Sequence, residues 1–247
     1  MIYVSNSPLA TYKKISPNKN SPRNHKIDTV SIHCVVGQFT AKEILNMSHF
    51  VKYDPSKGAS CNYAVGNDGS IGLGVDEKDR SWCTSSGSND NRAVTIEVAS
   101  DTKPPYKVTD KAYLALIDLL VDICKRNDIK ELKWKGDKSL IGNPDKQNMT
   151  VHRWFANKDC PGDYLYSRHG SIAKSVNARL ANPGQVTPYK VKINISDLNI
   201  RKGPGTNYDK TGKVTGKGVF TIVDEKSGWG KLKSGTGWVS LKYVTKI

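Results

Sequence analysis

The sequence has no long hydrophobic run, no apolar leader and few cysteines, and each absence excludes a class of protein. No stretch approaches the roughly 18 apolar residues that a membrane span needs, so we expect a soluble protein without membrane insertion. The first residues lack a charged leader followed by an apolar stretch, which argues against a standard secretory signal. The five cysteines are odd in number and form no Cys-x-x-Cys pair, which argues against a disulfide scaffold and favours synthesis in a reducing compartment.

Acidic residues are too few to balance the basic ones. The 247 residues include 38 Lys and Arg against 23 Asp and Glu, a formal net charge of +15. This excess indicates a polyanionic partner, which is a nucleic acid, an anionic membrane or an anionic polymer such as a bacterial cell wall. The sequence contains no zinc finger, helix-turn-helix or aromatic RNA-binding motif, so we rank nucleic acid last and expect none as partner.

Two different patterns divide the chain. Residues 112–127 place apolar side chains at three- and four-residue steps, which predicts a helix, and a second helix is expected over 168–180. After a stretch rich in Pro and Gly at 181–188, the chain alternates polar and apolar residues like a strand and is punctuated by Gly. We therefore expect a larger domain over 1–180, a linker over 181–188, and a small β domain over 189–247.

Short apolar runs predict the strands of the larger domain. Residues 28–36 and 93–99 are short, largely apolar runs with few polar insertions, as buried strands are. Residues 62–75 indicate a strand, an Asn-Asp-Gly turn and a second strand. The predicted fold class is α/β, a mixed central sheet with flanking helices, followed by a small all-β barrel.

Three residues have the chemistry of a zinc site. His33 lies inside an apolar strand, and His152 and Cys160 are eight residues apart in a predicted loop. Two imidazoles and a thiolate leave the fourth zinc position open, as in catalytic sites, and zinc chemistry suits amide hydrolysis. Each residue also has an ordinary explanation alone: a core histidine, a loop histidine bound to a carbonyl, and a small buried hydrophobe.

Glu97 is anomalous because it interrupts an apolar strand, where a carboxylate is costly unless it is paired or functional. Strand alternation would point Ile96 and Val98 into the core and Glu97 into a cleft. The functional interpretation is a general base that takes a proton from water. The alternative is a buried salt bridge to a basic residue.

These residues together resemble a known family. Strand-borne His33, the segment Ile-Glu-Val-Ala around Glu97, and the motif H-x5-K-x-C-P-G that begins at His152 resemble the type-2 N-acetylmuramoyl-L-alanine amidases. That family is related to peptidoglycan recognition proteins and phage lysozyme-amidases. The resemblance covers roughly residues 25–180.

The resemblance implies a role for each of these residues. By this likeness Zn²⁺ would be bound by His33, His152 and Cys160. Glu97 would be the catalytic acid and base. Lys158 would stabilise the tetrahedral oxyanion, a role that an ammonium group can fill electrostatically.

The chain departs from the family pattern in two segments. Aligned on its Asp-Gly turn, it has Asn62 where many relatives have a histidine, and Cys61 where phage lysozyme-amidases have an active-site tyrosine. Tyr63 lies on the other strand face, so we do not transfer that role to it. A Trp-His-Ala-Gly segment of relatives is Trp-Cys-Thr-Ser here, beginning at Trp82. We consider Asn62 and Trp82 candidates for lining the substrate cleft, with a structural role as the alternative.

The remaining cysteines and histidines are expected to be structural. Cys34 follows His33 on its strand and so points to the opposite face, into the core. Cys61 and Cys83 are candidates for neighbours in the sheet, but we do not expect a disulfide between them. We expect His25, His49 and His169 to lie at the surface.

The tail resembles the bacterial SH3-like domain. The resemblance rests on Leu-Asn-Ile-Arg-x-Gly-Pro-Gly at 198–205 and on two later Gly-Trp pairs. Trp229 and Trp238 are expected to supply the bulk of a small barrel core. Such modules in lytic enzymes commonly bind the cell wall, which implies peptidoglycan peptides or bridges as the target. A generic partner-binding barrel is the alternative.

The combined hypothesis is a zinc amidase that cuts the bond between N-acetylmuramic acid and L-alanine of the stem peptide. The context it suggests is the endolysin of a phage or prophage of a Gram-positive host, made in the host cytoplasm and released through a holin. A host autolysin is the alternative context. A non-catalytic peptidoglycan recognition protein is the alternative class, which the retained ligand set disfavours.

Overall fold

The chain forms two compact units, Met1–Leu180 and Ala181–Ile247, in a computed structural model that describes residues 6–181 and 188–247. Most of the linker expected at 181–188 lies outside the described residues, and Ala181 is the last residue of a helix. Each unit has its own hydrophobic core. No helix within the described ranges combines the length and hydropathy that a membrane crossing requires.

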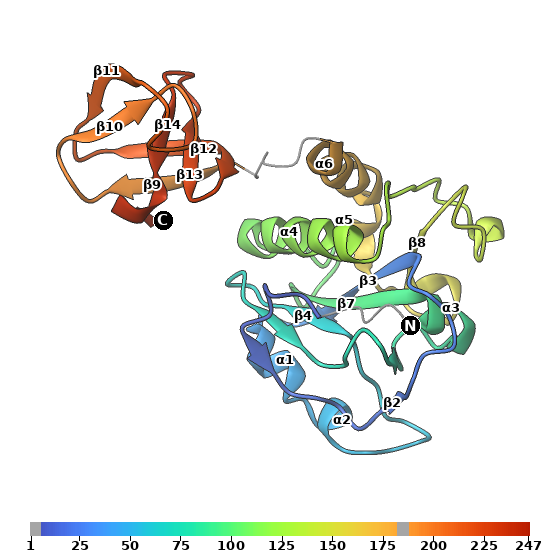
Figure 1. Ribbon diagram of the computed structural model, residues 1–247. Helices are drawn as coiled ribbons and strands as arrows, with labels where there is room; N and C mark the ends of the chain where they lie inside the picture. Colours follow the sequence, from blue (N-terminus) through green and yellow to red (C-terminus); the bar gives the residue numbers. More distant parts are fainter. Residues whose placement is uncertain (1–5, 182–187) are drawn as a thin grey trace. The chain divides into compact units, whose positions relative to one another are not determined.

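A mixed six-stranded sheet forms the centre of the first unit (Figure 1). The neighbouring strands are parallel except β4 and β5, which form the antiparallel pair that the Asn-Asp-Gly turn predicted. In spatial order the strands are β1 (Tyr12–Lys13), β5 (Ile71–Leu73), β4 (Tyr63–Val65), β7 (Ala93–Ser100), β3 (Thr29–Val36) and β8 (Met149–Thr150). A separate two-stranded sheet pairs β2 (Lys19–Asn20) with β6 (Arg80–Ser81). The predicted mixed α/β class is confirmed.

Helices cover both faces of this sheet. In Figure 1, α4 (Asp110–Arg126), α5 (Gly162–Tyr166) and α6 (His169–Ala181) lie on one face, and α1 (Ala41–Leu45) and α2 (Ser48–Val51) lie on the other. The short helix α3 (Gly87–Arg92) runs directly into β7. The side chain of Thr109 accepts a hydrogen bond from the Ala112 N–H and caps α4. The two helices predicted from periodicity are confirmed, each within two residues of its expected ends.

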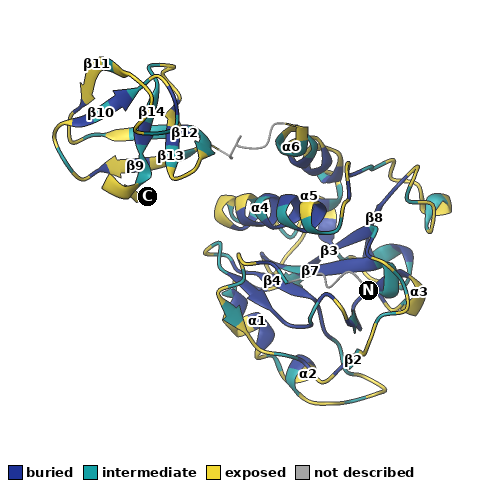
Figure 2. Cartoon of the chain, viewed as in Figure 1, coloured by how far each residue is buried: buried dark blue, intermediate teal, exposed yellow. Residues whose placement is uncertain are grey.

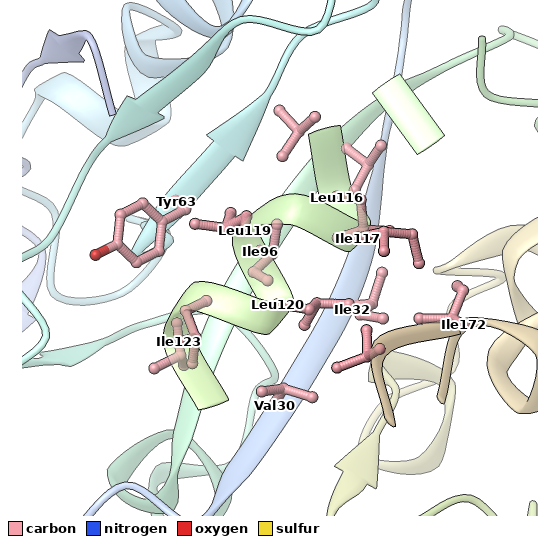
Figure 3. Packing of buried hydrophobic residues seen from close by; sticks show 14 of the residues in the cluster. Val30, Ile32, Tyr63, Ile96, Leu116, Ile117, Leu119, Leu120, Ile123 and Ile172 are labelled. Atoms are coloured by element: carbon pink, nitrogen blue, oxygen red, sulfur yellow. The ribbon is translucent and has the colours of Figure 1, made fainter. Parts of the chain in front are cut away.

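The main core lies between β3, β7 and α4. Val30, Ile32 and Ile96 point from the strands toward Leu116 and Leu120 of α4 (Figure 3). All five side chains have no exposed surface, and burying each aliphatic group contributes roughly 1.5–3 kcal/mol. Figure 2 shows both strands buried along nearly their whole length. Because residues alternate across a strand, the residues between these core positions point to the opposite face of the sheet.

The second unit is all β, as predicted, with seven strands and a short 3-10 turn, η3 (Leu241–Tyr243). Its core is aliphatic, and Val191, Ile200 and Ile222 are among its members. Trp229 and Trp238 are only half-buried and lie outside this core, so their expected role as core bulk was wrong. The spatial strand order is β11 (Lys210–Thr215), β10 (Leu198–Arg201), β14 (Trp238–Ser240), β13 (Trp229–Leu232), β12 (Val219–Lys226), β9 (Tyr189–Ile193) and β15 (Val244–Lys246).

Candidate active site

The pairing of β3 with β7 places the first two site residues side by side. The two strands are parallel over eight residues, and His33 is in register with Glu97. Ile32 and Ile96 fill the core beside α4, so His33 and Glu97 project from the other face of the sheet. The Nδ1 atom of His33 lies 3.9 Å from Oε1 of Glu97.

The hydrogen bonds of His33 fix which nitrogen is free. Its side chain has no exposed surface, and Nε2 lies 3.3 Å from the hydroxyl of Ser31. That hydroxyl donates its one hydrogen bond to the carbonyl of Thr150, so toward His33 it is the acceptor and Nε2–H donates to it. Burial, with His152 nearby, also holds the pKa of His33 well below its usual value. His33 is therefore neutral, with the lone pair on Nδ1, which is the form that binds a metal.

A loop brings the other two candidate ligands to His33. His152 begins a short 3-10 turn, η2 (His152–Trp154), and its ring centroid lies 5.1 Å from that of His33. The N–H of Arg153 donates to the carbonyl of Cys160 over 3.0 Å and closes the loop. The Cys160 Sγ atom lies 3.4 Å from Nδ1 of His33. The ligand atoms of His33, His152 and Cys160 all lie within 4.8 Å of one another.

This ligand set fits a zinc ion. Tetrahedral zinc with bonds of about 2.0–2.3 Å holds its nitrogen and sulfur ligands roughly 3.3–3.8 Å apart. The distance from Cys160 Sγ to His33 Nδ1 falls within that range, and the other ligand atoms require only small shifts. Two neutral imidazoles and a thiolate are donors that zinc prefers, and three protein ligands leave a position for a reactant.

Glu97 lies beside this group without a basic partner. Within residues 6–181 and 188–247 its carboxylate makes no salt bridge to Lys or Arg, and its Oε2 atom has no hydrogen-bond partner. Its Oε1 atom accepts a weak hydrogen bond from Cys83 Sγ at 3.9 Å. Burial raises the pKa of Glu97 to about 7. The side chain keeps 14% of its surface exposed, so water reaches a carboxylate poised to exchange protons at neutral pH.

Lys158 stands at the exposed edge of the site. Its side chain has no hydrogen bond or salt bridge to any residue that the structure describes, so its charge is not neutralised by a carboxylate. Burial lowers the pKa of His152, and the charge of Lys158 lowers it further. The ammonium group is therefore close enough to act on the site electrostatically. Its role at the oxyanion stays a prediction.

The two candidates for the cleft lining differ in position. Asn62 has no exposed surface, and its side-chain amide accepts from the Thr95 N–H and donates to the Val75 carbonyl. A substrate contact by Asn62 is therefore contradicted, because these bonds tie its amide to β7 and to the segment that follows β5 and leave nothing exposed. Trp82 is half-buried, its indole N–H donates to Asn20, and its ring lies 6.2 Å from that of exposed Tyr53. Trp82 stays a candidate.

The structure also settles the remaining cysteines and Tyr63. All five cysteines are free, including Cys61 and Cys83, between which no disulfide was expected. Cys34 lies in the core cluster beside α4, as predicted. Tyr63 is buried in the same cluster, and its hydroxyl donates to Glu77 over 2.6 Å, so it lies on the face away from the site.

Three neighbours of the site escaped the sequence analysis. Ser31 lies two residues before His33 and so shares its strand face, a spacing that strand alternation alone would reveal. Ser85, whose hydroxyl lies 3.0 Å from Nε2 of His152, and Cys83 belong to a connection that meets the site only in the folded chain. Both lie in the Trp-Cys-Thr-Ser segment that was compared with Trp-His-Ala-Gly of relatives, but that comparison placed neither of them at the site.

His169 was predicted at the surface, and this was wrong. Its side chain has no exposed surface, its Nδ1–H donates to the Leu165 carbonyl, and burial lowers its pKa to about 4. Its ring lies 4.4 Å from that of Trp134, which in turn stacks on Trp154 of η2 at 5.1 Å. His169 therefore helps to support the loop that carries His152.

Comparison with known proteins yields two matching domains. The family described as N-acetylmuramoyl-L-alanine amidase matches residues 23–163, and the bacterial SH3 domain matches residues 196–245. The putative N-acetylmuramoyl-L-alanine amidase YrvJ of Bacillus subtilis is 47% identical over 51 residues, which is 20% of this chain and about a tenth of the length of that protein.

Solved structures show a more distant likeness. A selenomethionine derivative of AmpD is 19% identical with a TM-score of 0.49, covering 68% of this chain and 96% of that one. Drosophila peptidoglycan recognition protein SA is 19% identical with a TM-score of 0.47, covering 63% and 88%. The amidase match covers more than half of the 247 residues, and the chain therefore belongs to the N-acetylmuramoyl-L-alanine amidase family, with a bacterial SH3 domain in its second unit.

Proposed function

We propose that the protein is a zinc-dependent peptidoglycan hydrolase that cleaves the amide bond between N-acetylmuramic acid and the L-alanine of the stem peptide. The observation that supports this most is the convergence of His33, His152 and Cys160 beside Glu97. A zinc ion held by the three ligands would polarise the scissile carbonyl and lower the pKa of water. Family membership supports the amide of the wall as the bond that is cut.

Glu97 moves the protons of this reaction. With a pKa of about 7, a large fraction of its carboxylate is ionised at neutral pH and accepts a proton from the attacking water. The water oxygen bonds to the carbonyl carbon, the carbon–nitrogen bond breaks, and the same proton passes to the leaving amine of L-alanine. One carboxyl group thus serves as base and then as acid.

Two further residues prepare the site for this step. Lys158 supplies an unpaired positive charge at the exposed edge, where it stabilises the negative charge that develops on the carbonyl oxygen. Ser31 holds the ring of His33 in the tautomer that leaves Nδ1 free. Neither residue forms a covalent bond to the substrate.

The second unit holds the enzyme on its insoluble substrate. We place its target in the peptidoglycan of a Gram-positive wall, in the stem peptides or their bridges, on the strength of the bacterial SH3 match. The context that we propose is a phage or prophage endolysin, made in the host cytoplasm and released through a holin, with a host autolysin as the alternative. The net charge of +15 favours retention on an anionic wall.

End-group analysis of purified Gram-positive walls tests this proposal. Digestion should release new L-alanine N-termini without new reducing sugars, stop when a chelator removes zinc, and resume when zinc is restored. Glu97→Gln, folded and metal-loaded, is the matched control and should release no termini. New reducing ends would instead indicate a glycosidase. Binding to walls without any new ends would indicate a recognition protein.

A further inference from the structure

His33 and Glu97 belong to a second group of potential metal ligands, completed by Cys83. One ligand atom from each of His33, Cys83 and Glu97 lies within 4.8 Å of the other two. The Glu97 Oε1 atom is 3.9 Å from both Cys83 Sγ and His33 Nδ1. These separations exceed the roughly 3.3–3.8 Å of a tetrahedral zinc site only slightly. Small side-chain rotations are enough to close them on an ion.

The donors of this second group are available to an ion. Cys83 is a free, buried thiol, and Oε2 of Glu97 has no hydrogen-bond partner among the residues described. A nearly buried carboxylate without a cation is costly, and a divalent ion would neutralise it. Sulfur, imidazole and carboxylate donors together suit Zn²⁺, Co²⁺ or Cd²⁺ rather than Mg²⁺ or Ca²⁺.

The two ligand groups share one nitrogen. Nδ1 of His33 lies 3.4 Å from Cys160 Sγ on one side and 3.9 Å from Glu97 Oε1 on another, while Nε2 is occupied by Ser31. One lone pair on Nδ1 binds one ion at a time. An ion held with His152 and Cys160 therefore excludes an ion held with Cys83 and Glu97.

We propose that His33, Cys83 and Glu97 form a second metal position for ions of the zinc type, exclusive of the position formed by His33, His152 and Cys160. An ion there is unproductive, because it takes Glu97 as a ligand and removes the group that accepts the proton. This consequence rests on the proposed function, whereas the metal binding itself does not. The partition of one ion between the two positions then sets the active fraction of the enzyme.

Cobalt spectroscopy of the full chain separates the two positions. In Cys160→Ser, Co²⁺ should still bind at one ion per chain and produce a thiolate-to-cobalt absorption band in the near ultraviolet. Adding Cys83→Ser should remove that band and weaken Co²⁺ binding on the order of 100-fold or more, as loss of a direct ligand exceeds a second-shell change. Adding Cys124→Ser instead is the matched control and should leave the band. Cys124 is buried in α4 within the main core, on the face of the sheet away from the site.

A second pair of variants guards against loss of folding in the first. His152→Ala removes a ligand of the first position only. This variant should still bind Co²⁺ and show a thiolate-to-cobalt band. Glu97→Gln added to His152→Ala should weaken that binding, while circular dichroism confirms that both chains are folded.

The outcomes distinguish the two proposals. A folded wild-type chain that binds no Co²⁺ overturns the zinc-dependent function. A wild-type chain that shows a thiolate band, with Cys160→Ser and His152→Ala folded but unable to bind, overturns the second position alone. A band in Cys160→Ser that survives Cys83→Ser overturns it as well.

Discussion

The site is built from two halves that are held in different ways. His33 and Glu97 are on β3 and β7, which are paired over eight residues and packed against α4 on their other face. Lys158 and Cys160 are on a partly exposed loop whose ends are joined by backbone hydrogen bonds, such as that between Arg153 and Cys160. The strand half is positioned by the core, and the loop half depends on a few contacts and on the ion that it would bind.

The largest effect is expected from the strand half. Replacing Glu97 with Gln should lower amide cleavage by about 10²–10⁴-fold, because the amide cannot accept the proton of water. Release of L-alanine N-termini, with zinc content measured in parallel, checks this. The variant should keep its zinc at the position of the three ligands. A zinc-loaded Glu97→Gln that cleaves at the wild-type rate would contradict the role of Glu97.

The next effect is expected from the loop half. Lys158→Ala should lower cleavage by about 10²–10³-fold, the usual cost of losing one group that stabilises an oxyanion. Lys158 is exposed and unpaired, so the free energy of unfolding should change by less than about 0.5 kcal/mol. Urea unfolding and kinetics together measure both. Lys158→Arg should recover part of the activity, and equal losses in both variants would argue against a role through charge.

Acid should lower the free energy of unfolding, because His169, which supports the loop half, is buried in its neutral form. Its pKa in the folded chain is about 4, below the unfolded value near 6.5, so the unfolded chain takes up the proton more readily. Stability present above pH 6.5 is therefore lost as the pH falls toward 4, by roughly 2–3 kcal/mol for this group. Urea unfolding between pH 7 and 4 measures the slope. His169→Phe should flatten it, and an unchanged slope would show that other groups cause the loss.

The smallest effect is expected at Ser31. Ser31→Ala removes the hydrogen bond to Nε2 of His33 and should weaken zinc binding about 10–100-fold, as is typical when such an outer partner is lost. A competition titration with a chromophoric chelator measures the affinity. Ser31→Thr keeps the hydroxyl and is the matched control. Equal affinity in Ser31→Ala and the wild-type chain would show that the core alone orients His33.

Much of the first unit was predictable because its signals are local. The buried strands show as largely apolar runs, and a charged residue in such a run, such as Glu97, is conspicuous because burying it is costly. The orientation of Glu97 followed from strand alternation, with Ile96 and Val98 in the core. These local patterns singled out Glu97 as a candidate before its contacts were known.

The failures share a physical cause. Asn62 was considered for the cleft because it aligns with a histidine of relatives, and His169 was expected at the surface because no ligand partner was found for it. Each is buried, with its hydrogen bonds made by distant or backbone groups. Trp229 and Trp238 were placed in the barrel core because they are large, but aliphatic residues fill that core and leave the indoles half-buried. Tryptophan is seldom fully buried, and a barrel this small has little room for two indoles.

The amino-acid sequence by itself determined the main strands and helices and pointed to three candidate zinc ligands, because alternation, helical periodicity and ligand chemistry are properties of the residues themselves and their neighbours. Only the tertiary structure decided which nitrogen of His33 is free and that Cys83 meets Glu97. The first depends on the carbonyl of Thr150, which accepts the Ser31 hydroxyl from a distant part of the chain, and the second on a connection that meets β7 only in the folded chain. Their distances depend on how the sheet, its helices and the connecting loops pack together, which no local pattern records.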